Sequence, residues 1–175
     1  MLVGYRCSGK TSVGKHLARE LGGQFFDTDT WIEKKAQCSI ETIVSRHGWD
    51  CFRSIEKELI KELSGGIKLV IATGGGVVMD EENVRNLKRT GFIVWLTAKA
   101  EVLKKRMLRD HRSGKSRPSL TGSDPLEEIT KVLSARASYY KKASDLVVDT
   151  TSLSPSQVAA LILRHFPEIC NCRTT

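Results

Sequence analysis

Long apolar runs and aromatic residues are both scarce in this sequence, and their scarcity excludes several classes of protein. No uninterrupted apolar stretch approaches the ~18 residues that suggest a membrane span, and aromatic residues make up 6% of the 175 positions. The apolar fraction of 40% is ordinary for a globular protein. We therefore expect a soluble protein that has no membrane partner.

Signals for export and for disulfide formation are also missing. The first residues contain no basic region followed by an apolar one, which disfavours a secretion signal or a transit peptide. The 5 cysteines form no CxxC pair, and their odd number suits a reducing compartment better than a disulfide framework. These absences predict a cytoplasmic location.

Nothing in the sequence marks a boundary between domains. It contains no repeat, no low-complexity segment and no linker rich in Pro, Gly and Ser. A length of 175 residues fits one domain with a substantial core. We expect a single domain over residues 1–166, followed by a polar, flexible tail over residues 167–175.

Positive charge exceeds negative charge and gathers in one segment. The net charge is +8, and residues 99–117 contain eight Lys or Arg residues against two acidic ones. No aromatic residue is interleaved with them, although proteins that bind single-stranded nucleic acid normally stack bases on aromatic rings. A solvated helix face explains part of this run, and small acidic ligands or nucleic acid remain open as partners.

Short apolar runs alternate with longer amphipathic stretches along the whole chain. The expected strands are residues 2–4, 24–29, 68–73, 92–97 and 145–150. The expected helices are residues 10–21, 30–37, 40–47, 49–63, 80–90, 100–109, 126–142 and 154–166, with Ser154 as an N-cap before Pro155. This alternation predicts an α/β fold, a parallel sheet covered by helices on both faces. Ligands of such sheets bind at the carboxyl ends of the strands.

The stretch GYRCSGKT, residues 4–11, matches the phosphate-binding pattern G-x-x-x-x-G-K-[ST]. Gly4 and Gly9 let the backbone wrap closely, so that N–H groups and the following helix N-terminus face phosphate oxygens. Lys10 is expected to reach the β- and γ-phosphates, and Thr11 to place its hydroxyl on Mg²⁺. The alternative is a strand-to-helix turn that is merely rich in glycine. The other residues of the predicted ATP site are Arg6, Cys7, Ser8 and Ser12.

Two carboxylates follow the second expected strand. Asp27 and Asp29 are two positions apart, which predicts that their side chains lie on the same side of a strand end. One of them can serve Mg²⁺ through water while the other accepts a proton from a hydroxyl group or orients it. As an alternative, Asp29 is only the N-cap of the helix that begins at Thr30.

Two further signals fall near strand ends or beside them. Arg53 lies near the start of a helix and Glu56 lies one turn later, where it can hold the guanidinium; a surface ion pair is the alternative. Gly74, Gly75 and Gly76 end a β-branched run, and three glycines permit a ligand to approach the backbone closely. A plain turn is the alternative there.

Taken together, the motifs resemble those of shikimate kinase. GYRCSGKT, FFDTD, the FR of DCFRSIE, ATGGGVV, RPSL and ARASYY occur in that family's order and approximate spacing, from residue 4 to about residue 166. The resemblance implies a three-layer P-loop kinase fold of the nucleoside-monophosphate-kinase type, with a five-stranded parallel sheet. It also implies a substrate-binding region at about residues 30–62 and a mobile lid at about residues 109–124.

The resemblance also implies an activity, the phosphorylation of the 3-hydroxyl of shikimate by MgATP, in the route to chorismate and aromatic amino acids. Asp29 would hold the substrate hydroxyls and act as the base or orienting group, with Asp27 near the water shell of Mg²⁺. Arg53 and Arg136 would bind the shikimate carboxylate. Gly75 and its neighbours would lie against the ring.

The basic segment would supply the remaining contacts to the nucleotide. Arg117, in the lid, would touch the phosphates, and Arg109, with Arg112 close behind, is our choice for the adenine. The chain departs from the family in two places. The lid reads RPSL where RPLL is common, and Arg6 and Cys7 stand where small residues are frequent.

Two rival functions remain open at this point. One is another small-molecule kinase of the same fold, acting on a sugar acid or a nucleoside monophosphate. The other is a non-catalytic module that binds a nucleotide or nucleic acid, which the net charge of +8 permits. The resemblance favours a monomer that binds ATP and shikimate, not nucleic acid.

Overall fold

The computed structural model describes residues 1–65, 68–112 and 125–171. The RPSL motif with Arg117, and most of the predicted lid, lie outside these residues. Within the three described ranges, no helix combines the length and the apolar character needed to cross a membrane.

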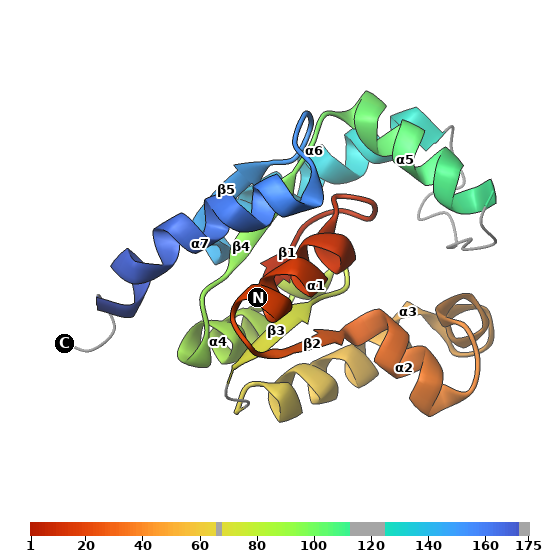
Figure 1. The fold of residues 1–175 in the computed structure, drawn as a ribbon. Helices are drawn as coiled ribbons and strands as arrows, with labels where there is room; N and C mark the ends of the chain where they lie inside the picture. Colours follow the sequence, from red (N-terminus) through yellow and green to blue (C-terminus); the bar gives the residue numbers. More distant parts are fainter. Residues whose placement is uncertain (66–67, 113–124, 172–175) are drawn as a thin grey trace.

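A five-stranded parallel sheet forms the centre of the molecule, as predicted (Figure 1). Its strands are β1 (Leu2–Val3), β2 (Gln24–Asp27), β3 (Leu69–Ala72), β4 (Val94–Thr97) and β5 (Leu146–Asp149). They lie in the order β2-β3-β1-β4-β5, and every neighbouring pair is parallel. The order places β1 in the middle, so the loop that follows it emerges at the centre of the sheet's carboxyl edge.

Helices cover both faces of this sheet (Figure 1). They are α1 (Lys10–Glu20), α2 (Thr28–Ala36), α3 (Ile40–Leu63), α4 (Glu81–Thr90), α5 (Ala100–Arg112), α6 (Pro125–Ala143) and α7 (Pro155–Asn171), with a 3₁₀ turn, η1 (Val77–Met79). Successive residues of β1 point to opposite faces. Leu2 packs in the core beneath α1 and α7, and Val3 packs in the core that includes residues of α3, α4 and α6. The fold therefore has the three layers that the sequence predicts.

The start of α7 confirms the predicted cap. The Ser154 hydroxyl accepts a hydrogen bond from the Gln157 N–H at 3.3 Å, and the Gln157 side chain accepts one from the Ser154 N–H at 2.9 Å. This reciprocal pair satisfies backbone donors that a helix start leaves unpaired. The helix continues to Asn171. Residues 167–171 are thus helical, and the helix extends beyond the predicted residues 154–166.

A break inside α3 separates the two helices that were predicted at residues 40–47 and 49–63. Gly48 has φ 78° and ψ 171°, a conformation that only glycine adopts readily. The chain changes direction there. The second part of α3 is then anchored by Phe52 and Leu59, which pack with Ile32 of α2 and Ile43 in a core of their own.

Candidate active site

Two connected hollows lie at the carboxyl ends of the strands. The larger groove follows the P-loop and the start of α1, and its far end is lined by Leu153, Pro155 and Val158. The smaller pocket is lined by the glycine turn, Arg53 and Arg136, among others. The two share four lining residues, Arg6, Asp29, Glu33 and Ser39. A molecule in the groove and one in the pocket would therefore meet beside Asp29.

The P-loop has the backbone that its glycines predict. Gly4 and Gly9 have φ values of 141° and 101°, and a Cβ at Gly4 would lie 2.3 Å from the Leu96 carbonyl oxygen. Lys10 is buried, and its Nζ donates to the carbonyl oxygens of Gly4 and Tyr5 at 2.9 and 2.8 Å. The ammonium group is thus held within the loop, where the backbone N–H groups of the loop would bind phosphates.

The other predicted P-loop residues also line the larger groove, namely Arg6, Cys7, Ser8, Gly9, Thr11 and Ser12. Cys7 has a positive φ of 60°, which is uncommon for a residue that carries a side chain. Ser8 is buried, and its carbonyl oxygen accepts a hydrogen bond from the Thr150 hydroxyl at 3.1 Å. The loop is therefore fixed against the end of β5 as well as by its own glycines.

Thr11 and Asp27 are neighbouring residues of the groove lining that could ligate a metal ion through oxygen. The Thr11 hydroxyl donates to Asp27 Oδ2 at 2.8 Å, and Asp27 Oδ1 accepts from the Thr30 N–H at 3.3 Å. A hydroxyl and a carboxylate are hard ligands of the kind Mg²⁺ prefers, and Mg²⁺ usually keeps several waters beside one or two protein ligands and the phosphates. The pair therefore fits the predicted metal site.

The predicted strand geometry of Asp27 and Asp29 is wrong. Strand β2 ends at Asp27, and Asp29 lies in the first turn of α2, so the two-residue period of a strand does not apply to the pair. The N-cap is Asp27 and not Asp29, because the Asp27 side chain accepts from Thr30 N–H and starts the helix early. Both carboxylates still line the larger groove, and only Asp29 of the two also lines the smaller pocket.

Arg53 is aimed into the smaller pocket by a buried acid. Its Nη1 donates to Glu56 Oε2 at 2.5 Å, and the Glu56 side chain is 1% exposed while that of Arg53 is 32% exposed. Burial raises the pKa of the Glu56 carboxyl, and the Arg53 guanidinium opposes that rise. A carboxylate held out of water is a fixed anchor, so this pair is not the surface ion pair that was the alternative.

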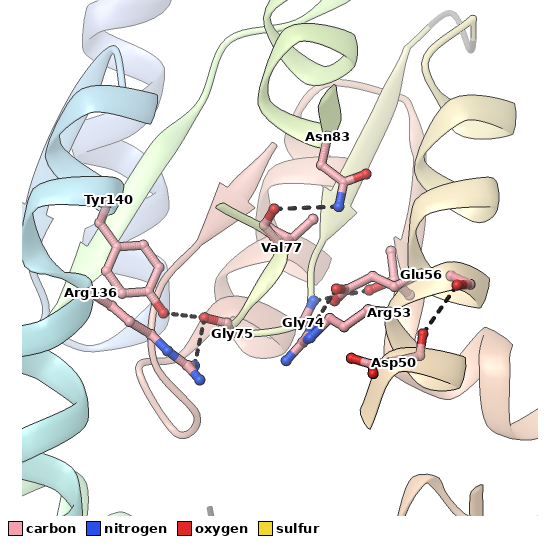
Figure 2. A network of polar contacts seen from close by, with 11 residues as sticks. Asp50, Arg53, Glu56, Gly74, Gly75, Val77, Asn83, Arg136 and Tyr140 are labelled. Atoms are coloured by element: carbon pink, nitrogen blue, oxygen red, sulfur yellow. Dashed lines mark hydrogen bonds and ion pairs between the residues drawn. The ribbon is translucent and has the colours of Figure 1, made fainter. Parts of the chain in front are cut away.

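The glycine turn makes room for these charged side chains (Figure 2). A Cβ at Gly74 would lie 2.4 Å from Glu56 Oε1 and 3.0 Å from Asp29 Oδ1. A Cβ at Gly76 would lie 2.3 to 2.7 Å from the guanidinium atoms of Arg53. The prediction gave these glycines one purpose, the approach of a ligand. The structure adds a second purpose, because the protein's own acids and Arg53 occupy the space that side chains would fill.

Arg136 reaches the pocket from the other side, from α6. Its Nη1 donates to the Gly75 carbonyl oxygen at 3.1 Å, and the Tyr140 hydroxyl donates to the same oxygen. Figure 2 shows Arg53 and Arg136 on either side of the glycine turn. Two guanidinium groups from distant segments therefore converge on one pocket that Asp29 also lines.

Arg6 connects the P-loop to α6. Its Nη2 lies 2.7 Å from Glu128 Oε1, and the two side chains are only 10% and 4% exposed. Arg6 lines both the groove and the pocket. The sequence analysis placed Arg6 only in the ATP site and did not identify Glu128. The neighbouring Glu127 lies in the same predicted helix, and no feature of the sequence sets Glu128 apart from it.

The residue predicted to contact adenine is Arg109, on α5. Arg109 is exposed and is not among the described residues that line the groove. Arg106, on the same helix, does line it and donates to the Thr150 carbonyl at 2.6 Å and to the Cys7 carbonyl at 3.4 Å. The run of cations predicted a basic helix, and no feature of the sequence distinguished the inward residue from its neighbours.

Comparisons with known proteins identify the family of this chain. The family model for shikimate kinase matches residues 6–167. A shikimate kinase of Syntrophus aciditrophicus is 41% identical over 95% of this chain and 89% of that relative, and one of Thermodesulfovibrio yellowstonii is 40% identical over 99% and 98%. The structure of shikimate kinase from Acinetobacter baumannii in complex with shikimate superposes with a TM-score of 0.88 at 33% identity, covering 95% of this chain and 91% of that one. With its P-loop, its acidic groove floor and its arginine-lined pocket in one P-loop kinase fold, the chain belongs to the shikimate kinase family.

Proposed function

We infer that this protein transfers the γ-phosphoryl group of ATP to the 3-hydroxyl of shikimate, giving shikimate 3-phosphate and ADP, in the route to chorismate and aromatic amino acids. The observation that carries this inference is the convergence of Arg53, Arg136 and Asp29 on one pocket that opens into the P-loop groove. A small ring acid with hydroxyl groups needs planar cations at one end and a carboxylate acceptor at the other. The pocket offers both.

In the proposed complex, the shikimate carboxylate lies between the guanidinium groups of Arg53 and Arg136. Each has a donor engaged already, Arg53 with Glu56 and Arg136 with Gly75, and guanidinium has five N–H donors in all. The remaining donors face the carboxylate. The ring then lies against Gly74, Gly75 and Gly76, and its hydroxyl groups reach Asp29, which is 7% exposed and borders both hollows.

ATP would occupy the larger groove. Its phosphates would bind the P-loop N–H groups, and Lys10 would exchange the Gly4 and Tyr5 carbonyl oxygens for oxygens of the β- and γ-phosphates. The base would extend toward the apolar end at Leu153 and Pro155, beside Arg106. We propose Arg106 for the adenine end in place of Arg109. Arg117, which lies outside the described residues, stays a prediction for the phosphates.

Thr11 and Asp27 would hold Mg²⁺, directly or through water, and the ion would supply positive charge to the phosphate oxygens. Asp29 accepts the proton of the 3-hydroxyl as that oxygen bonds to the γ-phosphorus and the bond to the ADP oxygen breaks. Lys10 stabilises the negative charge on the transferred group. Most of the catalysis comes from positioning and charge, since the protein forms no covalent bond.

The test is ADP release with MgATP, measured with and without shikimate, for the natural chain and for Asp29→Asn. The natural chain should release ADP only when shikimate is present, and Asp29→Asn should lower kcat by about 10²- to 10⁴-fold. Asp50→Asn is the matched control, because Asp50 lies on α3 outside the residues that line either hollow.

Other acceptors test the rival functions. Gluconate and a nucleoside monophosphate, offered in place of shikimate, should give no ADP above background. Turnover with either and not with shikimate would assign the pocket to another small-molecule kinase. Retention on nucleic acid without any ADP release would favour a non-catalytic module. The monomeric state is a separate prediction, which sedimentation at assay concentration tests.

A further inference from the structure

Tyr140 forms a hydrogen bond with Gly75 of the smaller pocket but does not itself line that pocket. We call this pocket the acceptor pocket, because the proposed function places shikimate, the phosphoryl acceptor, in it. The residue is fully buried, its ring stacks on Trp95 with centroids 5.4 Å apart, and its hydroxyl donates to the Gly75 carbonyl oxygen (Figure 2). Burial raises the pKa of that hydroxyl to about 12, so it remains a donor at neutral pH. The chemistry proposed above assigns no role to this buried polar group.

The hydrogen bond from Tyr140 ends on the carbonyl oxygen of Gly75, in the middle of the glycine turn. Gly75 lies between two other glycines, and glycine peptides rotate more freely than others because no Cβ restricts them. A carbonyl oxygen has two lone pairs, and here one accepts from Tyr140 and the other from Arg136. The orientation of this carbonyl and the anchoring of the Arg136 guanidinium are therefore coupled.

We propose that Tyr140 is a positioning residue for acceptor binding, which fixes the Gly75 carbonyl so that Arg136 presents its free donors to the substrate carboxylate. Tyr140 and Arg136 lie four residues apart on α6, so both side chains project from one face of the helix toward the same oxygen. The Tyr140 ring is held by the core, whereas Arg136 must remain available to the ligand. The tyrosine thus supplies the rigid half of the arrangement. This inference rests on the proposed function, because it assumes that Arg136 binds the acceptor's carboxylate.

The first experiment compares Tyr140→Phe with Tyr139→Phe in the full chain. Phenylalanine keeps the ring and its stacking on Trp95 and removes only the hydroxyl. Tyr139, the neighbouring residue, is 44% exposed and lines neither hollow. For Tyr140→Phe we expect the KM for shikimate to rise about 3- to 10-fold, the value of one hydrogen bond, with kcat and the KM for ATP changed less than about 2-fold. Tyr139→Phe should match the natural chain.

The second experiment tests whether Tyr140 acts through Arg136. In an Arg136→Lys background, adding Tyr140→Phe should change the KM for shikimate less than about 2-fold, because the guanidinium that the tyrosine positions is gone. An equal rise in both backgrounds would overturn the proposal, since the two residues would then act independently. Unfolding temperatures of all variants are measured alongside.

The remaining outcomes separate this inference from the function on which it rests. An unchanged KM for shikimate in Tyr140→Phe, in a chain that is otherwise active, overturns the inference alone. A lower unfolding temperature with equal losses toward shikimate and ATP also overturns it, because the hydroxyl would then serve stability only. A natural chain that releases no ADP with shikimate overturns the proposed function and this inference together.

Discussion

Some residues near the candidate site act by leaving space for other side chains, and others act through the contacts that they make. Gly74 and Gly76 illustrate this, because each leaves a space that a charged side chain of α2 or α3 occupies. Glu56 is the complementary case, a buried acid whose carboxylate fixes the guanidinium of Arg53 at the edge of the pocket. Filling the space at Gly76 or removing the Glu56 carboxylate should therefore displace the same group, the Arg53 guanidinium.

The Gly76 position allows a direct test of this view. Gly76 has φ −107°, which any residue adopts, so Gly76→Ala introduces no backbone strain and only a methyl group that meets the Arg53 guanidinium. Displacing that guanidinium removes a charge-assisted hydrogen bond to the substrate, and the KM for shikimate should rise about 10- to 100-fold. The KM for ATP should stay nearly constant. Steady-state kinetics with each substrate varied in turn give both values.

Gly65→Ala is the matched control for this substitution. Nothing lies within 4 Å of a Cβ added there, and the residue is outside both hollows. Its kinetics should equal those of the natural chain. If Gly76→Ala bound shikimate as tightly as the control does, Arg53 would not be required in its present position.

At the scale of secondary-structure elements, helix α6 contacts both parts of the candidate site. Near its start, Glu128 pairs with Arg6 of the P-loop, and two turns later Arg136 and then Tyr140 contact the glycine turn after β3. One helix therefore contacts both the loop that would hold ATP and the turn that would hold the acceptor. Its position is set by Ile129 and Val132, which pack with Tyr5 and Leu103.

Glu128→Gln tests the energetic weight of this connection. The change removes the negative charge beside a buried guanidinium, and a buried ion pair that loses one charge is destabilising. We expect the free energy of unfolding to fall by about 1–3 kcal/mol, measured by urea denaturation. Glu127→Gln alters the adjacent residue, whose side chain is 67% exposed and 4.0 Å from Lys131, and should change stability by less than about 0.5 kcal/mol. Equal effects would show that the Arg6–Glu128 pair contributes no more than a surface pair.

At the scale of the whole molecule, the parallel sheet brings segments from along the chain to one edge. The P-loop after β1, Asp27 at the end of β2, the glycine turn after β3 and Thr150 after β5 all lie there. Because the groove and the pocket join at this edge, ligands in both should stabilise the folded chain together.

Thermal unfolding measures this stabilisation. At about 100 times its dissociation constant a ligand adds about 2.7 kcal/mol, which for a chain of this size raises Tm by roughly 5–10 °C. We expect such a rise with shikimate, and a further rise with a non-hydrolysable ATP analogue and Mg²⁺. Removing Mg²⁺ with a chelator should reduce the effect of the nucleotide while leaving that of shikimate. Equal loss of both effects would place the metal in the acceptor pocket and contradict its assignment to Thr11 and Asp27.

Much of the fold and part of the site could be predicted from the sequence. Buried parallel strands are short, nearly continuous apolar runs, and all five were recognisable on that ground. The P-loop depends on residues adjacent in the chain, so its glycines and Lys10 were identified from spacing alone. The prediction that Asp29 lies at a strand end was wrong for a local reason. The Asp27 side chain caps α2, so the helix starts within the segment predicted as strand.

The sequence by itself determined the backbone framework, because hydrophobic periodicity, glycine positions and helix caps act between residues that are near in the chain. Only the tertiary structure decided which of many similar charges face the site. Arg106 and not Arg109 lines the groove, Glu56 and Glu128 are buried anchors, and Tyr140 meets Arg136 on one carbonyl oxygen. These pairings join α5 to β5, the P-loop to α6, and α6 to the glycine turn. Charged and aromatic side chains acquire such partners through the packing of segments that are distant in the chain, so no local sequence pattern predicts these partners.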